Sequence, residues 1–211
     1  FAQNNQAVSE ISGETLKGFT KNIFKYADFT EGKIFLKDGS KYGAKLNYNR
    51  VFGQITTIDR IGKAAPLSNI ETLDKVTITN DTFYFFNNNV LEKITHFGNG
   101  NLYLKQTMVY VVEQKDGYNG TPDVISDASK KIYDAEPKKE DVNIEKNSQF
   151  KVINEYFIAD QSMNFISANK KNFYDLFADH KEELKTFLRE HSTDFSNINQ
   201  MEKLLQYMNN L

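Results

Sequence analysis

The middle of the chain follows an alternating pattern of apolar and polar residues. Over positions 42–48, apolar side chains recur at every second residue from Tyr42 to Tyr48, with Gly, Lys or Asn between them. A period of two predicts a half-buried β-strand with one face in solvent. Asp38-Gly39 lies just before this strand, and such a dipeptide favours a tight hairpin turn. The pattern therefore predicts a β-hairpin at 34–48.

Further apolar segments of strand length follow, and turn residues such as Asn, Asp and Gly separate most of them. The expected strands occupy residues 54–59, 73–79, 82–86, 90–97, 101–105, 108–114, 150–159 and 163–167. Parallel strands need crossover connections of a dozen or more residues, so these short turns indicate antiparallel pairing. The polar segment 116–148 contains Pro122 and Pro137 and is expected to be a long loop, partly mobile or functional.

From residue 169 the apolar residues recur with a helical period. One stripe holds Phe173, Leu176, Phe177, Leu184, Phe187 and Leu188. Asp179 and Glu182 have the spacing of a capping box, which predicts that the segment divides into helices at 170–178 and 180–191. The stripe indicates helices that bury one face.

A last helix is expected at 198–209, with Asn197 or Asn199 as its N-cap. Strands followed by helices are typical of the α+β class. We therefore expect a twisted antiparallel sheet, with the option of a barrel-like closure, followed by about three C-terminal helices. The expected organisation is a partly helical or irregular N-terminal segment at 1–29, a β domain at 30–167 and a helical segment at 168–211 that packs on the sheet.

Composition narrows the class of protein. The 211 residues are 39% hydrophobic and 13% aromatic, which is enough to bury a core. The 26 basic and 28 acidic residues give a net charge of −2, which argues against nucleic acid as a partner. No segment approaches the roughly 20 apolar residues that span a bilayer. The absence of Cys excludes disulfides and thiolate metal sites.

The first residues, Phe1-Ala2-Gln3, fit the remnant that cleavage of a signal peptide leaves. An arbitrary start of the chain is the alternative interpretation. The first interpretation predicts an exported protein.

Several segments resemble a known group of proteins. Residues 32–39 read GKIFLKDG and residues 46–49 read LNYN, while the tail reads KKNFYDLF at 170–177, KEELK at 181–185 and LLQY at 204–207. Together with Tyr118-Asn119-Gly120, these segments resemble uncharacterised exported proteins of Bacteroidota. That group has an LKDG…LNYN hairpin and a lysine-rich helical C-terminal tail.

The resemblance implies an exported protein, periplasmic or associated with the cell envelope, whose partner is an unknown envelope component or protein. The group has no assigned activity, so the resemblance implies no catalytic residue. This chain has Ala178 where the similar proteins often have Pro, so the resemblance does not fix the helix break.

A loop holds the candidate ligand-binding residues, which are Tyr118, Asn119, Gly120 and Thr121. Here an amphipathic Tyr stands between two glycines, and loops of this kind often carry binding residues. The alternative is that Tyr118 covers the end of the sheet.

The sequence offers little sign of catalysis. His180 and His191 stand near glutamates in the helical tail, but their spacing does not require a common metal, so surface histidines are the simpler interpretation. His96 at a strand end is expected to be a hydrogen-bonded histidine rather than a base. A pair of carboxylates that acts as acid and base would become visible only in three dimensions. No metal, cofactor or catalytic residue is assigned.

The aromatic segment Phe83-Tyr84-Phe85-Phe86 bears on the function. It predicts either a strand covered on both faces or the wall of an apolar cavity. The sequence thus favours a non-catalytic binding or structural module of the envelope. The alternatives are a carrier of a lipid or other hydrophobic ligand in a cavity of the sheet, and a hydrolase that uses paired carboxylates.

Overall fold

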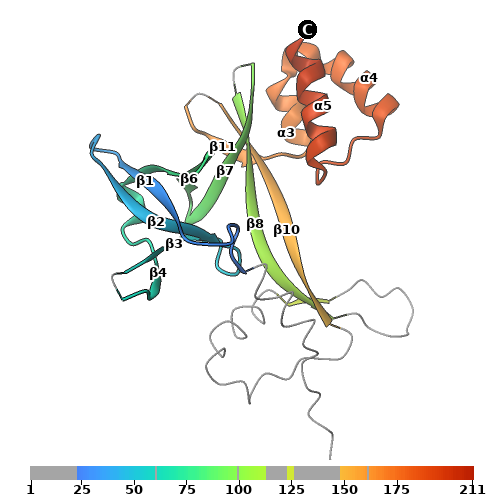
Figure 1. Cartoon of the computed structure of the whole chain (residues 1–211). Coiled ribbons are helices and arrows are strands. Elements are labelled where there is room, and N and C mark those ends of the chain that lie inside the picture. The colour runs from blue at the N-terminus through green and yellow to red at the C-terminus, as the bar shows by residue number, and fades with distance from the viewer. Residues whose placement is uncertain (1–22, 60, 99, 113–122, 126–147, 161) are drawn as a thin grey trace, which may run out of the picture. The chain divides into compact units, whose positions relative to one another are not determined.

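The computed structural model describes residues 23–59, 61–98, 100–112, 123–125, 148–160 and 162–211 (Figure 1). Most of the expected N-terminal segment and most of the expected loop at 116–148 lie outside the described residues. The candidate binding residues Tyr118, Asn119, Gly120 and Thr121 also lie outside them, and their role stays a prediction.

Strands come first in the described part of the chain and α-helices come last. The strands are β1 (Thr30–Leu36), β2 (Lys41–Asn49), β3 (Gln54–Ile58), β4 (Ala64–Pro66), β5 (Leu73–Ile78), β6 (Asp81–Phe86), β7 (Asn89–Phe97), β8 (Gly100–Val112), β9 (Asp123–Ile125), β10 (Ser148–Asp160) and β11 (Phe165–Ser167). The helices are α3 (Lys170–Leu176), α4 (Lys181–His191) and α5 (Ile198–Asn209), with short 3₁₀ helices η1 (Ile70–Thr72) and η2 (Ala178–His180).

The strands follow the order β11-β10-β8-β7-β6-β5-β1-β2-β3-β4, and β9 pairs with β8. Each pair whose register is known is antiparallel, for example Ile34 opposite Val76 in β1 and β5. The predicted α+β class, the antiparallel sheet and the three C-terminal helices are confirmed.

Besides shifts of one or two residues at several strand ends, the strands differ from the expectation in three ways. β8 is one strand where the sequence predicted two, because the polar pair Gln106-Thr107 keeps an extended backbone. The short strands β4 and β9 were missed. β9 lies in the range that was expected to be a loop, and it pairs with Tyr110–Val112. Three residues are too few to show an alternating pattern, so the sequence does not indicate this strand.

The chain divides into two compact units. The first contains Leu46–Pro66 and the described residues of Phe1–Phe29 and Gln106–Ile153. The second contains Thr30–Lys45 and the described residues of Leu67–Lys105 and Asn154–Leu211. β2, β8 and β10 therefore contribute residues to both units.

The first unit buries polar side chains. Asn47 and Asn49 are 1% and 2% exposed, so the solvent position that the alternation predicted for Asn47 is wrong. Asn47 accepts from Tyr26 N at 3.1 Å and donates to Tyr26 O at 2.8 Å and to Asp28 O at 3.2 Å. The Asn47 side chain thus bonds the backbone of residues 26–28 in the way a neighbouring strand would. Because these hydrogen bonds satisfy its amide, the side chain can be buried.

Arg50 is a second residue of this unit whose side chain bonds distant segments. Its Nη1 donates to Phe24 O at 2.8 Å, and its Nε donates to Gln106 Oε1 at 3.3 Å. The backbone of Arg50 also bonds Ile23 O and Met108 N. Tyr48 Oη donates to Gln106 O at 2.7 Å. Segments far apart in the sequence are therefore joined by side chains as well as by strand pairing.

The second unit contains a large apolar core. Helix residues Phe173, Leu184, Met201 and Leu204 are each 0% exposed. They belong to one cluster with the strand residues Phe97, Leu102, Tyr156 and Ile158. The apolar stripe predicted for the tail therefore faces strands of this unit. Among the described helices, none is both long enough and apolar enough to cross a membrane.

The helix caps agree only in part with the prediction. Asn197 caps α5 by accepting from Gln200 N at 3.3 Å, and Asn169 caps α3 by accepting from Asn172 N at 3.0 Å. The predicted capping box is wrong, because Asp179 lies inside η2 and the N-cap of α4 is His180, which makes no side-chain cap bond. The segment still divides into two helices as predicted, and the 3₁₀ helix η2 stands between α3 and α4.

The aromatic strand β6 is covered by other side chains. Phe83 is fully buried, while Tyr84 and Phe86 pack on a second apolar cluster of Leu91, Tyr103, Ala159 and Phe165. The Tyr103 ring lies 4.8 Å from the Phe165 ring and 5.6 Å from the Tyr84 ring, centroid to centroid. Other side chains of this unit thus cover the aromatic strand, as the first of the two expectations has it.

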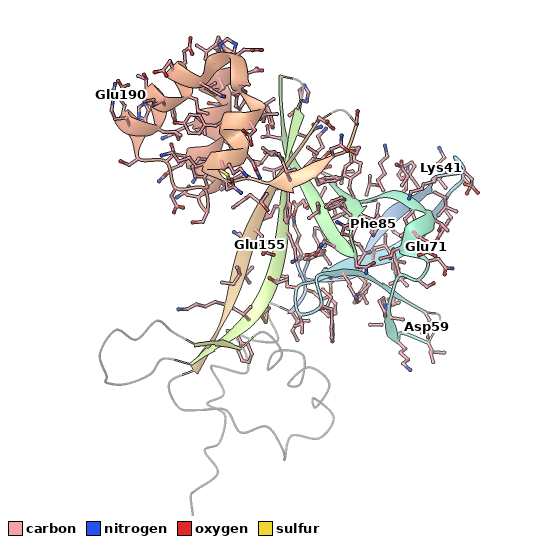
Figure 2. All side chains as sticks on the ribbon, turned by 180° about the vertical axis from the view of Figure 1, so that it is seen from behind. Lys41, Asp59, Glu71, Phe85, Glu155 and Glu190 are labelled. Atoms are coloured by element: carbon pink, nitrogen blue, oxygen red, sulfur yellow. The ribbon has the colours of Figure 1, made fainter. Side chains whose placement is uncertain are left out.

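On β10, the Glu155 carboxylate forms an ion pair of 2.7 Å with Lys105; Figure 2 labels Glu155.

Candidate functional site

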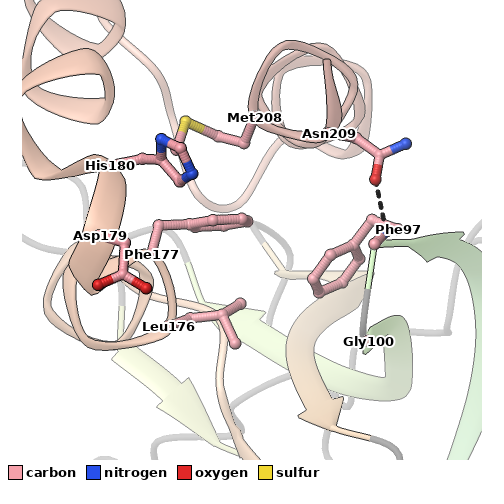
Figure 3. Close-up of a pocket in the computed structure, with 9 residues that line it drawn as sticks. Phe97, Gly100, Leu176, Phe177, Asp179, His180, Met208 and Asn209 are labelled. Carbon is pink, nitrogen blue, oxygen red and sulfur yellow. Dashed lines mark hydrogen bonds between the residues drawn. The ribbon is translucent and has the colours of Figure 1, made fainter. Parts of the chain in front are cut away.

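A pocket of about 290 Å³ lies in the second unit, where the turn of the β7–β8 hairpin meets the helical tail (Figure 3). The apolar side chains of Phe97, Leu176, Phe177 and Met208 line it. The polar residues Asp179, His180 and Asn209 line it as well. Such a combination of apolar walls and a few polar groups is the usual composition of a ligand site.

The end of helix α3 creates the apolar wall. Phe177 is the C-cap of α3, and its N–H donates to Phe173 O at 2.9 Å. Because the helix stops there, its ring turns toward Phe97, at 6.2 Å between centroids. Figure 3 shows the two rings facing the same space as Leu176. Leu176 is 36% exposed, so it offers apolar surface to a ligand.

One hydrogen bond holds the hairpin turn against the last helix. Asn209 Oδ1 accepts from Gly98 N at 2.6 Å, and Figure 3 marks this bond. Gly98 has a φ of 38°, a left-handed value that glycine adopts at low cost. The bond uses the acceptor of the Asn209 amide. Its NH₂ group makes no hydrogen bond within the part of the chain that the structure describes, so it can donate to a ligand.

Gly100 closes the strand side of the pocket. A Cβ at this position would lie 2.9 Å from Ala159 O and 2.9 Å from the Phe97 ring. No side chain fits there without moving backbone, so glycine allows the hairpin to approach β10 closely. The pocket's floor is consequently set by backbone packing rather than by a mobile side chain.

The pocket holds few groups for catalysis. Asp179 is the only carboxylate among its lining residues, so it lacks the pair that glycoside hydrolysis requires. In the described residues, no group of three or more His, Asp or Glu side chains could hold a metal. His191 stacks on Phe187 at 4.3 Å, and exposed His96 bonds Asn101 at 3.2 Å. The pocket is therefore suited to binding an apolar group.

Sequence reasoning found part of this pocket. It placed Leu176 and Phe177 on the apolar stripe and weighed His180 as a surface residue or metal ligand. It did not bring them to Phe97, Gly100 and Asn209, because the contact depends on how the tail docks on the strands.

Comparisons with protein-family models, with curated proteins and with solved structures found no match to this chain.

Proposed function

We propose that the protein is a non-catalytic binding module that takes an apolar side chain of a partner protein into the pocket between the β7–β8 turn and the helical tail. The observation that supports this most directly is the exposed apolar wall at Leu176 beside Phe97 and Phe177. Interface hot spots form where one apolar or aromatic residue fills a desolvated pocket.

The polar rim suggests which residue the partner offers. The Asp179 carboxylate makes no ion pair or hydrogen bond within the described part of the chain, and the NH₂ group of Asn209 is likewise available. A partner with an aromatic residue and an adjacent Lys or Arg satisfies both the apolar wall and the carboxylate. A purely apolar ligand would make no favourable contact with the Asp179 carboxylate.

The size of the pocket favours this function over a lipid carrier. About 290 Å³ lies at the lower end of the roughly 300–1,000 Å³ found for small-molecule sites. That space suits one side chain better than a lipid tail. The export of the protein to the cell envelope is part of the same proposal and rests on the sequence resemblance.

Cross-linking in the host cell tests the partner. A photo-reactive phenylalanine analogue at position 176 should form a covalent adduct with another protein, and the fraction that contains the adduct reports the compartment. Position 211 is the control, because Leu211 is 52% exposed and does not line the pocket. No adduct from 176, or equal adducts from both positions, contradicts the proposal.

Binding to a small probe tests the pocket itself. N-acetyl-tryptophan amide should shift the NMR signals of Met208 and Phe97. Leu176→Gln should weaken that binding about three- to tenfold, since only part of a leucine side chain is buried by the probe. Leu211→Gln should leave it unchanged. Equal effects of the two variants place the probe elsewhere.

A further inference from the structure

A second hollow lies on the strand face of β1, β2 and β5, within the second unit. Its volume is about 500 Å³. The side chains around it belong to Glu31, Lys33, Lys41, Tyr42, Thr77 and Thr79, and the glycines Gly32 and Gly43 also line it. We propose that this groove, called here the lysine groove, binds an acidic sugar, meaning a sugar ring that carries a carboxylate, as part of an acidic polysaccharide.

Strand register places these side chains on one face. Lys33 stands opposite Thr77, so the two side chains project on the same side of the sheet. The next pair, Ile34 and Val76, is buried and projects to the other side. Lys41 and Gly43 are two residues apart on β2 and therefore share a face. The β1 and β5 part of the groove thus lies on the solvent side of strands whose other side is buried.

A missing side chain forms the floor of the groove. Glycine in a strand interior lowers stability and often marks a place where a ligand approaches the backbone. The backbone at Gly43 does not require glycine, because its φ lies outside the left-handed range and a Cβ would meet only Gly32 O, at an ordinary 3.7 Å. The fold tolerates a side chain here, so the hollow is not a by-product of tight packing.

The charges of the groove are available to a ligand. Lys33 and Lys41 are exposed, and neither makes an ion pair or hydrogen bond within the described residues. Figure 2 shows Lys41 at the outer end of its strand. Two ammonium groups beside an exposed stretch of backbone attract an anion.

The other lining groups decide which kind of anion fits. Glu31 carries a negative charge, which repels a ligand that is anionic throughout. Glu31 can accept hydrogen bonds from hydroxyl groups, and Thr77 adds a hydroxyl of its own. A sugar acid offers one carboxylate for the lysines and several hydroxyls for Glu31 and Thr77. Phosphate recognition usually employs the Arg fork, and no Arg lines this groove.

The test measures calorimetric binding of trigalacturonate, a three-ring sugar acid, to the whole protein. Its fully methyl-esterified form has the same rings and hydroxyls without the charge and should bind at least tenfold more weakly. Hexaglutamate and inorganic phosphate carry the charge without the sugar and should also bind more weakly. If hexaglutamate binds as tightly as trigalacturonate, the groove recognises acidic peptides and the proposal is wrong.

Two variants locate the site. Gly43→Val places a β-branched side chain on the floor, where strands accept it, so binding should be lost while the thermal midpoint stays or rises. Lys33→Gln with Lys41→Gln should weaken binding about three- to tenfold, as expected for two exposed charge contacts. The matched control is Lys63→Gln with Lys203→Gln, two exposed lysines outside the groove. Unchanged binding in Gly43→Val, or equal losses in the two lysine pairs, overturns the proposal.

Discussion

The two units of this protein hold their segments together by different chemistry. In the second unit, helices α3, α4 and α5 bury an apolar stripe against strand residues, with Phe173 and Leu204 fully enclosed. In the first unit, Asn47 and Arg50 bond backbone carbonyls of the segment around Phe24 and Tyr26. Apolar burial is non-directional and tolerates small shifts, whereas hydrogen bonds hold one geometry. The comparison predicts that the two units respond differently to the same size of substitution.

The largest effect is expected at Phe173. Its side chain is 0% exposed, and its ring lies 5.2 Å from the Phe195 ring and 6.1 Å from the Phe177 ring. Phe173→Ala should lower the free energy of unfolding by about 3–5 kcal/mol, since it removes a buried ring and leaves a cavity. Urea denaturation measures this. Leu176→Ala, on the same helix but partly exposed, should cost under about 1 kcal/mol. Similar losses in both variants would mean that the stripe does not carry the stability.

A polar substitution should have the next largest effect, in the first unit. Asn47→Asp keeps the shape of the side chain but turns its donor into a second acceptor. Two backbone carbonyls, of Tyr26 and Asp28, then face a carboxylate. We expect a loss of about 2–3 kcal/mol, because buried acceptors are left without donors. Urea denaturation gives the size of the loss.

Hydrogen exchange shows where the loss of Asn47→Asp occurs. The amide of Tyr26, which donates to Asn47 Oδ1, should exchange faster in the variant. Asn199→Asp, at an exposed position of α5, is the control and should change neither quantity. Unchanged exchange at Tyr26 would show that the Asn47 side chain does not hold this segment in place.

Replacing Arg50 by Lys keeps the positive charge and tests whether the directions of the two hydrogen bonds matter. A guanidinium reaches Phe24 O and Gln106 Oε1 from two nitrogens of one rigid plane, while an ammonium is a single point donor. Arg50→Lys should therefore cost about 1–2 kcal/mol, by loss of one bond to a charged donor. Lys63→Arg is the reverse change at an exposed position of the same unit and should be neutral. Stability equal to that of the parent would show that only the positive charge matters.

The contrast between the units explains what the sequence could predict. The stripe from Phe173 to Leu188 recurs with the helical period, and apolar periodicity reports the face that leaves water. Phe173, Leu184 and Phe187 are buried as predicted, whereas Leu176 on the same stripe is 36% exposed. Asn47 occupies a position where alternation predicts solvent, yet it is buried. Its role depends on backbone atoms some 20 residues earlier, and no local pattern encodes that meeting. The same limit applies to the pocket, where Phe177 was predicted on the stripe but its approach to Phe97 was not.

The smallest expected effect concerns pH and the interior of the second unit. Burial and, to a smaller extent, the nearby Tyr84 together raise the pKa of Tyr103 to about 12, against a weaker lowering by Asn101. The folded state therefore keeps this proton at a pH where the unfolded chain, with an ordinary pKa near 10, begins to lose it. Its contribution to stability is fully present below about pH 10 and declines as the pH rises toward 12.

Urea midpoints at pH 8, 10 and 11 measure that decline. The parent protein should lose stability over this range more steeply than Tyr103→Phe, which has no proton to release at this position. Tyr103→Phe also removes the contact of the hydroxyl with Met163 Sδ at 3.6 Å, which lowers stability equally at each pH and leaves the slope unaffected. If Tyr103→Phe loses stability with pH as steeply as the parent protein, Tyr103 does not keep its proton in a dry cluster. Water would then reach the interior of the second unit at this point.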